Sequence, residues 1–163
     1  ITQIFTLEDV PEAVDLAMRM NALQMNVYMT INTIKPQAII KAGKGATKAD
    51  ILRAHYSFAD ADDLQGLEGL IRLSNKQTPD ITVTTGTVPH ERRHAYWCFS
   101  EPCHDLQYWT EIQKRIAIEF KTDNAVIDKS RIMRLPGTVS FPSTTKQRKG
   151  YVSELVTMQL GEK

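Results

Sequence analysis

The stretch Phe58-Ala59-Asp60-Ala61-Asp62-Asp63 decides how this sequence is organised. Residues two apart on a strand point to the same side, so Asp60 and Asp62 should project together from one face, with Phe58 beside them. Two converging carboxylates keep their charges only when cations join them, and hard cations such as Mg²⁺ prefer oxygen ligands. Taken alone, the pattern is more often a strand end followed by an acidic helix start, which is the role we expect for Asp63.

On both sides of this stretch, strand patterns alternate with helical ones. The order mixes hairpins with crossover helices, and it predicts an α+β domain with a mainly antiparallel sheet backed by helices. A turn is expected at Glu101-Pro102 and a flexible loop over residues 41–48. We expect helices over 8–23, 63–73 and 105–120, a short helix near 47–50, strands over 26–32, 55–62, 81–85, 94–99 and 151–159, and short extended pieces over 38–40, 125–128 and 132–135.

Three of the expected helices carry apolar stripes at helical spacing, which indicates core packing rather than a cofactor site. The stripe of the helix over 63–73 consists of Leu64, Leu67, Leu70 and Ile71. The first helix should bury Val10, Val14, Ala17, Met18 and Ala22. The helix over 105–120 should bury Leu106, Trp109, Ile112, Ile116 and Phe120.

Length and composition describe an ordinary globular protein. The chain has 163 residues, of which 42% are hydrophobic and 24% charged, enough for one domain with a core. Its net charge of +1 says little about partners, but residues 114–149 form a basic stretch that suits a polyanionic ligand. Two cysteines and the absence of a long apolar run predict a cytoplasmic protein without a membrane partner. Because the chain begins at Ile1, we expect residues 1–163 to be a single domain cut from a longer protein.

The segment His90-Glu91-Arg92-Arg93-His94 matches the H-E-x-x-H pattern of zinc proteases. That chemistry needs a helix, on which both histidines share a face and the glutamate acts as base. Pro89 and the strand-like sequence on both sides disfavour a peptidase, which stays an alternative. A weaker alternative is a zinc site with ligands drawn from His90, His94, Cys98, Cys103 and His104.

A third carboxylate candidate is Asp128, which follows two apolar residues. Arg131 and Arg134 stand shortly after it, and Lys146 comes next. Three acids with nearby cations are what two-metal phosphoryl transfer needs, because the acids hold the metal ions and the cations neutralise phosphates.

Three motifs stand in order along the chain. The first is the D-x-D of Phe58–Asp62, and the second is Thr85-Gly86 followed by His94-Ala95-Tyr96-Trp97. The third is Asp128 followed by Arg131 and by the R-L-P-G-T of Arg134–Thr138. This set resembles the archaeo-eukaryotic primase superfamily, in particular the primase-polymerase domains of phage, plasmid and mobile-element replication proteins. The resemblance covers about residues 54–146, and the ordered combination is much more specific than D-x-D alone.

The resemblance implies a palm similar to an RNA-recognition motif and a DNA-directed primase or polymerase activity. A 3′-hydroxyl would attack the α-phosphate of a ribo- or deoxynucleoside triphosphate on a single-stranded DNA template or a primer–template, and pyrophosphate would leave. Asp60, Asp62 and Asp128 would bind two Mg²⁺ or Mn²⁺ ions, and a helicase domain in the same parent chain would fit the family. His94 would act with them on the phosphates, and the nucleotide-binding residues would be His90, Arg92, His94, Arg131, Arg134 and Lys146.

Two departures from the family leave alternatives open. The loop over residues 87–93 is longer than the compact second motif and contains His90, so either His90 or His94 could face the nucleotide. We favour His94, because it begins the strand His94-Ala95-Tyr96-Trp97. Ser140 and Phe141 stand where members often have Asn and Lys, which leaves Lys146 open as a phosphate ligand. A non-catalytic nucleic-acid-binding module of a replication protein is the remaining alternative.

Overall fold

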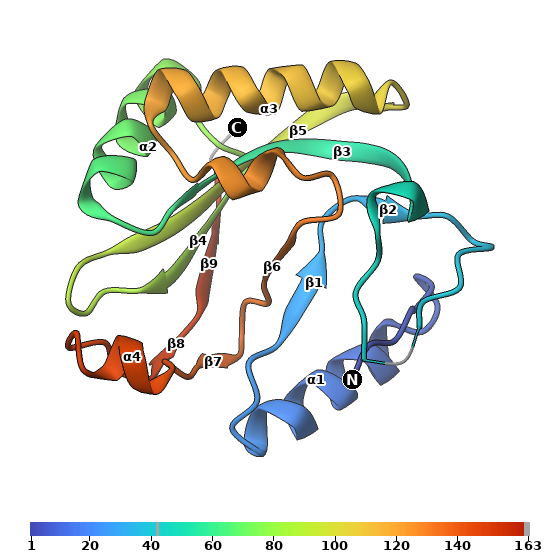
Figure 1. Cartoon of the computed structure of the whole chain (residues 1–163), viewed down its shortest axis with the longest axis horizontal. Helices are drawn as coiled ribbons and strands as arrows, with labels where there is room; N and C mark the ends of the chain where they lie inside the picture. The colour runs from blue at the N-terminus through green and yellow to red at the C-terminus, as the bar shows by residue number, and fades with distance from the viewer. Residues whose placement is uncertain (42, 162–163) are drawn as a thin grey trace.

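A five-stranded antiparallel sheet forms the centre of the protein, as seen in a computed structural model that describes residues 1–41 and 43–161. The strand order is β2-β3-β5-β4-β9, and every neighbouring pair is antiparallel. Helices α2 (Leu64–Lys76) and α3 (Leu106–Phe120) pack against β3 and each other (Figure 1). The expected α+β architecture is therefore confirmed. The strands are β2 (Thr33–Ile34), β3 (Ile51–Ala61), β4 (Ile81–Gly86), β5 (Arg92–Cys103) and β9 (Thr157–Leu160).

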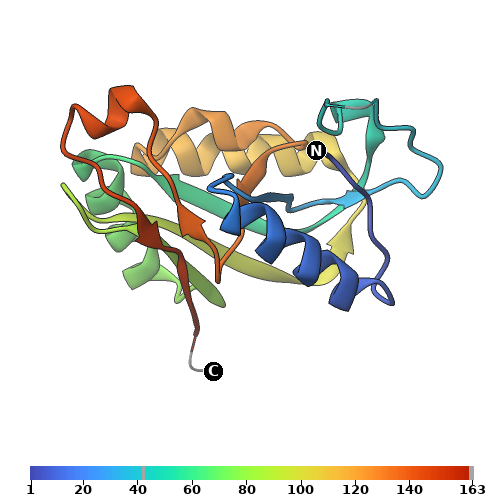
Figure 2. The same cartoon turned by 90° about the horizontal axis from the view of Figure 1, so that it is seen from below.

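Smaller elements surround this sheet. Strands β1 (Tyr28–Thr30) and β6 (Ile132–Arg134) form one antiparallel pair, and β7 (Val139–Ser140) and β8 (Glu154–Leu155) form another. Helix α1 (Val10–Ala22) lies on the far side of the molecule from α3 and nearest the viewer in Figure 2. No helix in the described parts of the chain has the length and apolarity to span a membrane. The short helices are η1 (Lys48–Asp50), η2 (Asn124–Ile127) and α4 (Thr144–Gln147).

One face of β3 packs against the helices through small side chains. Ala59 and Ala61 lie in a buried cluster with Leu70 of α2. Helix α2 also approaches α3 closely, because a Cβ atom at Gly69 would lie 1.6 Å from the Phe120 carbonyl oxygen. Only glycine fits at that contact. The helices therefore seal this face, and the functional residues of β3 must project from the opposite one.

The outer edge of β3 is completed by side chains of α3. Strand β2 pairs only with the first residues of β3, so the following backbone groups need other partners. Gln113 accepts a hydrogen bond from the Phe58 amide at 3.1 Å and donates one to the Phe58 carbonyl at 2.8 Å. Trp109 donates its indole N–H to the Tyr56 carbonyl at 2.8 Å. These bonds fix α3 and the chain after it beside the end of β3.

Several local expectations were wrong. Strand β5 does not turn at Glu101-Pro102 but continues to Cys103, because an irregularity opposite β3 absorbs the extra residues. Residues 125–127 are not extended, since the Asp123 side chain accepts from the Ala125 amide and begins η2, and only Asp128 of the expected piece has extended backbone. The expected closing strand over 151–159 is split into β8 and β9, and no strand forms over 38–40 in the described residues. Helix α4 was not expected, although Ser143 caps it.

The apolar stripe of α1 faces solvent more than expected. Ala17 is buried, whereas Val10, Val14 and Met18 remain about half exposed. The helix is held instead by Asn21, whose side chain donates to the Val139 carbonyl and accepts from the Val139 amide, both at 2.8 Å. These two hydrogen bonds to β7 therefore determine which face of α1 packs against the rest of the protein.

Candidate active site

Asp60 lies at the centre of a polar cluster on the open face of the sheet. It stands opposite His94 of β5, as Phe58 stands opposite Tyr96, so these four side chains share the face expected for Phe58 and Asp60. Asp60 is only 5% exposed. Asp62 follows β3 and is exposed, and Asp63 caps α2 by accepting from the Gly66 amide at 2.7 Å.

Burial makes the Asp60 carboxylate costly to ionise. It raises the pKa of Asp60 to about 7, and the neighbouring charges of Asp62 and Asp123 act in the same direction. Arg131 and Lys146 oppose them. The buried Oδ1 atom of Asp60 has no hydrogen-bond partner among the described residues. Unpaired buried acceptors are rare, so this atom marks a position suited to a ligand.

His94 is neutral at physiological pH. Burial lowers the pKa of its imidazole to about 4, and the positive charges of Arg134 and Arg131 add to the effect while Asp62 opposes it. Its Nε2 atom lies 3.6 Å from Asp60 Oδ1, and its Nδ1 atom lies 3.2 Å from the Tyr96 hydroxyl. A Tyr96 hydroxyl that donates to Nδ1 leaves the ring proton on Nε2, which faces the carboxylate.

The carboxylate brought beside Asp60 in the structure is Asp123, which the sequence did not single out. Its backbone amide donates to the Asp60 carbonyl at 2.9 Å, along the same outer edge of β3 that Gln113 completes. Arg131 bridges the two acids, with Nη2 3.3 Å from Asp123 Oδ2 and 3.8 Å from Asp60 Oδ2. No sequence pattern pointed to Asp123, because the residues that follow it were expected to be extended.

Asp128 makes a different set of contacts. Its Oδ1 accepts from the Ser130 amide and hydroxyl, both at 2.9 Å, and its Oδ2 lies 3.7 Å from Lys48 Nζ. Partial burial raises the pKa of Asp128, but the bonds from Ser130 and the charge of Lys48 outweigh it and hold the pKa below its usual value. Asp128 thus has local partners that Asp60 lacks.

Arg92 is held inside the protein rather than presented to solvent. Its guanidinium lies 3.0 Å from Glu154 Oε2 and also donates to the Val88 and His90 carbonyls. A Cβ atom at Gly86 would lie 1.8 Å from Arg92 Nη2, so the T-G of the second motif makes room for this guanidinium. The pair ties β8 to the loop between β4 and β5.

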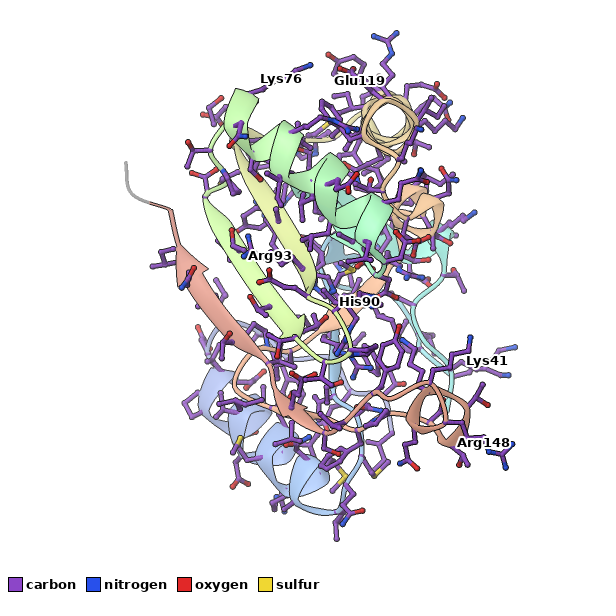
Figure 3. The ribbon with its side chains drawn as sticks, turned by 90° about the vertical axis from the view of Figure 1, so that its left-hand side faces the viewer. Lys41, Lys76, His90, Arg93, Glu119 and Arg148 are labelled. Carbon is purple, nitrogen blue, oxygen red and sulfur yellow. The ribbon has the colours of Figure 1, made fainter. Side chains whose placement is uncertain are left out.

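Two cationic side chains, those of Arg92 and Lys146, lie against the Tyr151 ring. The Arg92 guanidinium lies 4.6 Å from the Tyr151 ring centre, and Lys146 Nζ lies 5.3 Å from it. The His90 ring meets Tyr151 edge to face, and His90 Nε2 lies 2.9 Å from the Asp62 carbonyl oxygen. Figure 3 shows His90 in the loop before β5. These contacts fix Lys146 and His90 beside Asp62.

A narrow crevice joins these groups to Asp62. Besides Asp62, it is lined by Arg92, Arg134, Lys146 and Tyr151. Arg134 donates to the Asn26 side chain at 2.7 Å. Neither Arg134 nor Lys146 takes part in an ion pair with a carboxylate of the described residues, so both can attract an anionic group.

The H-E-x-x-H segment does not have the geometry of a zinc protease. Its second half lies on strand β5 rather than on a helix, and Glu91 pairs with Arg93 at 2.7 Å. Cys98 and Cys103 are free thiols that approach nearby backbone carbonyls. Across residues 1–41 and 43–161, no three histidine, cysteine or acidic side chains form a group that could hold a metal ion by themselves.

The Asp60 cluster nevertheless suits a divalent cation that is completed by ligands from a substrate. The unpartnered Oδ1 atom and the repulsion from Asp62 and Asp123 would both be relieved by a bound cation. Carboxylate oxygens suit Mg²⁺ and Mn²⁺, and Mg²⁺ is commonly held by one or two carboxylates plus substrate phosphates.

Comparison with known proteins reveals a structural neighbour. The AEP domain (PP-N190) of the cyanophage S-2L primase-polymerase, PrimPol, superposes with a TM-score of 0.61 over 97% of this chain and 70% of that one. The chain has the fold of a primase-polymerase domain. At 24% sequence identity, the likeness confirms the resemblance at the level of the fold. No family model and no curated protein matches the sequence.

Proposed function

We propose that this protein is a primase-polymerase domain of the archaeo-eukaryotic primase superfamily, a DNA-directed nucleotidyltransferase. The observation that carries the proposal is Asp60: a buried carboxylate with an unpartnered oxygen, flanked by two further acids, on the open sheet of a fold shared with a primase-polymerase. The proposed substrates are nucleoside triphosphates and a DNA template, with or without a primer. The whole of residues 1–163 would serve as one catalytic domain.

In the proposed reaction, a 3′-oxygen forms a bond to the α-phosphorus of the incoming nucleotide. The bond from that phosphorus to the β-phosphate bridging oxygen breaks, pyrophosphate leaves, and the hydroxyl proton is released to solvent. Bound Mg²⁺ or Mn²⁺ would stabilise the charge on the phosphates and favour the ionised 3′-oxygen. Asp60, Asp62 and Asp123 would hold these ions, whereas Asp128 would keep Lys48 in place.

The remaining polar residues bind and orient the triphosphate. Lys146 and Arg134 stand in the crevice that Asp62 lines and would neutralise its charge. His94, kept neutral by burial, would donate a hydrogen bond from Nε2 without adding a charge. Arg92 supports this arrangement from within, because Glu154 and two carbonyls already occupy its guanidinium.

Primer extension tests the proposal. A labelled primer on a DNA template is incubated with Mg²⁺ or Mn²⁺ and either ribo- or deoxynucleotides, and wild type is compared with Asp62→Asn. We expect the variant to lose at least about 100-fold in rate because a metal ligand is gone. Asp63→Asn is the matched control, since Asp63 caps α2 and should change the rate little. Equal extension rates for wild type and Asp62→Asn would refute the proposal. DNA binding by wild type without nucleotide incorporation would favour a non-catalytic nucleic-acid-binding module.

A further inference from the structure

A second cavity, distinct from the crevice at Asp62, lies beside the carboxylate cluster. Its volume is about 410 Å³, within the usual range of sites that hold small molecules. It is formed by η1, η2 and the segment that leads into β6. We refer to it as the η2 groove.

The η2 groove reaches the reaction centre through Arg131. This side chain lines the groove and also lies 3.8 Å from the Asp60 carboxylate. Its Nε atom is buried without a hydrogen-bond partner in the described residues. A molecule in the groove would therefore be in contact with a residue that touches Asp60.

The lining of the η2 groove combines an apolar surface with two cations. Ala125, Ile127 and Ile132 supply the apolar part, and Ile132 is 46% exposed. Lys48 and Arg131 supply the positive charges, and the Lys48 charge is partly balanced by Asp128. A nucleoside with a single phosphodiester fits this combination, because base and sugar can cover the apolar residues while one cation meets the phosphate.

The two cavities differ in the positive charge that they offer, and this difference matches the two substrates of nucleotidyl transfer. The crevice at Asp62 offers Arg134 and Lys146 without carboxylate partners among the described residues, which suits a triphosphate. In the η2 groove both cations already face carboxylates, which suits a ligand of lower charge.

We propose that the η2 groove binds the acceptor nucleotide, the one whose 3′-hydroxyl attacks. This assignment rests on the proposed function. The acceptor comes either from the 3′ end of a primer or from a free nucleotide at the start of synthesis, and both present the same nucleoside with a 3′-hydroxyl.

The kinetic test uses Ile132→Glu, which places a negative charge on the groove surface at a partly exposed position. The Michaelis constant for primer–template should rise about tenfold, while the Michaelis constant for the nucleotide should change less than about twofold. Ile118→Glu on α3, where the side chain is 74% exposed, is the matched control and should change neither. The assignment is overturned if the nucleotide constant changes instead, or if both variants behave alike. Thermal unfolding of both variants checks that they fold.

Photocrosslinking tests the same groove without turnover. A primer–template that carries a photoreactive thymidine at the primer 3′ end should crosslink to residues 124–132, located by mass spectrometry. A photoreactive free nucleotide with unprimed template forms a second arm, and crosslinking there in the same segment would assign the groove to initiation as well. Crosslinks of the primer end to residues 140–152 would refute the proposal. If wild type incorporates no nucleotide but the primer end still crosslinks within 124–132, the proposed function fails, and the acceptor role is replaced by simple binding of a DNA 3′ end in the groove.

Discussion

Replacing Asp60 by Asn should stabilise the metal-free protein at alkaline pH. The folded protein holds the Asp60 proton up to about pH 7, whereas the unfolded chain releases it near 3.8. Between these values unfolding releases a proton, so the free energy of unfolding of the wild type falls as pH rises. Full ionisation of a carboxyl group with its pKa moved from 3.8 to about 7 costs the folded state about 4 kcal/mol.

His94 contributes with the opposite sign. Its pKa is lowered from 6.5 to about 4 in the folded state, so its effect on stability increases with pH over that range and offsets Asp60 in the wild type. The difference between variant and wild type isolates Asp60, because both proteins keep His94. Relative to wild type, Asp60→Asn should gain about 3–4 kcal/mol in free energy of unfolding between pH 4 and pH 8, because the pKa of about 7 already includes the attraction of Arg131.

The assay is urea unfolding of both proteins from pH 4 to pH 8.5 in the presence of a chelator. The stability difference should grow with pH and level off above about pH 7. A difference that stays constant with pH, or that shrinks as pH rises, would refute the placement of an ionisable, buried Asp60. Adding Mn²⁺ in place of the chelator should stabilise the wild type and leave Asp60→Asn unchanged.

Three further predictions separate roles within the site. Asp123→Asn should slow primer extension at least about tenfold, while Asp128→Asn should keep the rate within about threefold of wild type. The reason is that Asp123, and not Asp128, lies beside Asp60. A larger loss for Asp128→Asn than for Asp123→Asn would make Asp128 the third metal ligand instead. Glu154→Gln should lower the free energy of unfolding by about 2–4 kcal/mol in urea, since Arg92 is left buried without a counter-charge, and an unchanged midpoint would contradict this. Tyr151→Leu should raise the Michaelis constant for nucleotide about threefold or more through loss of the cation–π contact with Lys146, whereas Tyr151→Phe should behave like wild type.

The sequence was informative wherever local periodicity decides the outcome. Strand alternation is a property of neighbouring residues, so it placed Asp60 on the same face as Phe58 and left Asp63 to cap the next helix. The mainly antiparallel sheet backed by α2 and α3 followed from the same patterns. The motif order predicted the primase-like fold, which the structural neighbour confirms.

The sequence could not reveal contacts that depend on packing between distant segments. Asp123 comes beside Asp60 only because α3 completes the outer edge of β3 and directs the following chain along it. From the sequence, Arg92 was expected to bind a nucleotide. In the structure its guanidinium is buried instead, because Glu154 on a distant strand pairs with it and Gly86 leaves space for it. The roles of His90, His94, Arg131, Arg134 and Lys146 toward a nucleotide stay predictions.

Primer extension by Asp60→Asn, measured on the same sample whose stability has been determined, tests the central claim most directly. The account predicts a folded variant, more stable than wild type above pH 7, that adds no nucleotide to a primer with Mg²⁺ or Mn²⁺ while wild type adds the nucleotide complementary to the template. Template-directed extension by the stable variant at the wild-type rate would contradict it.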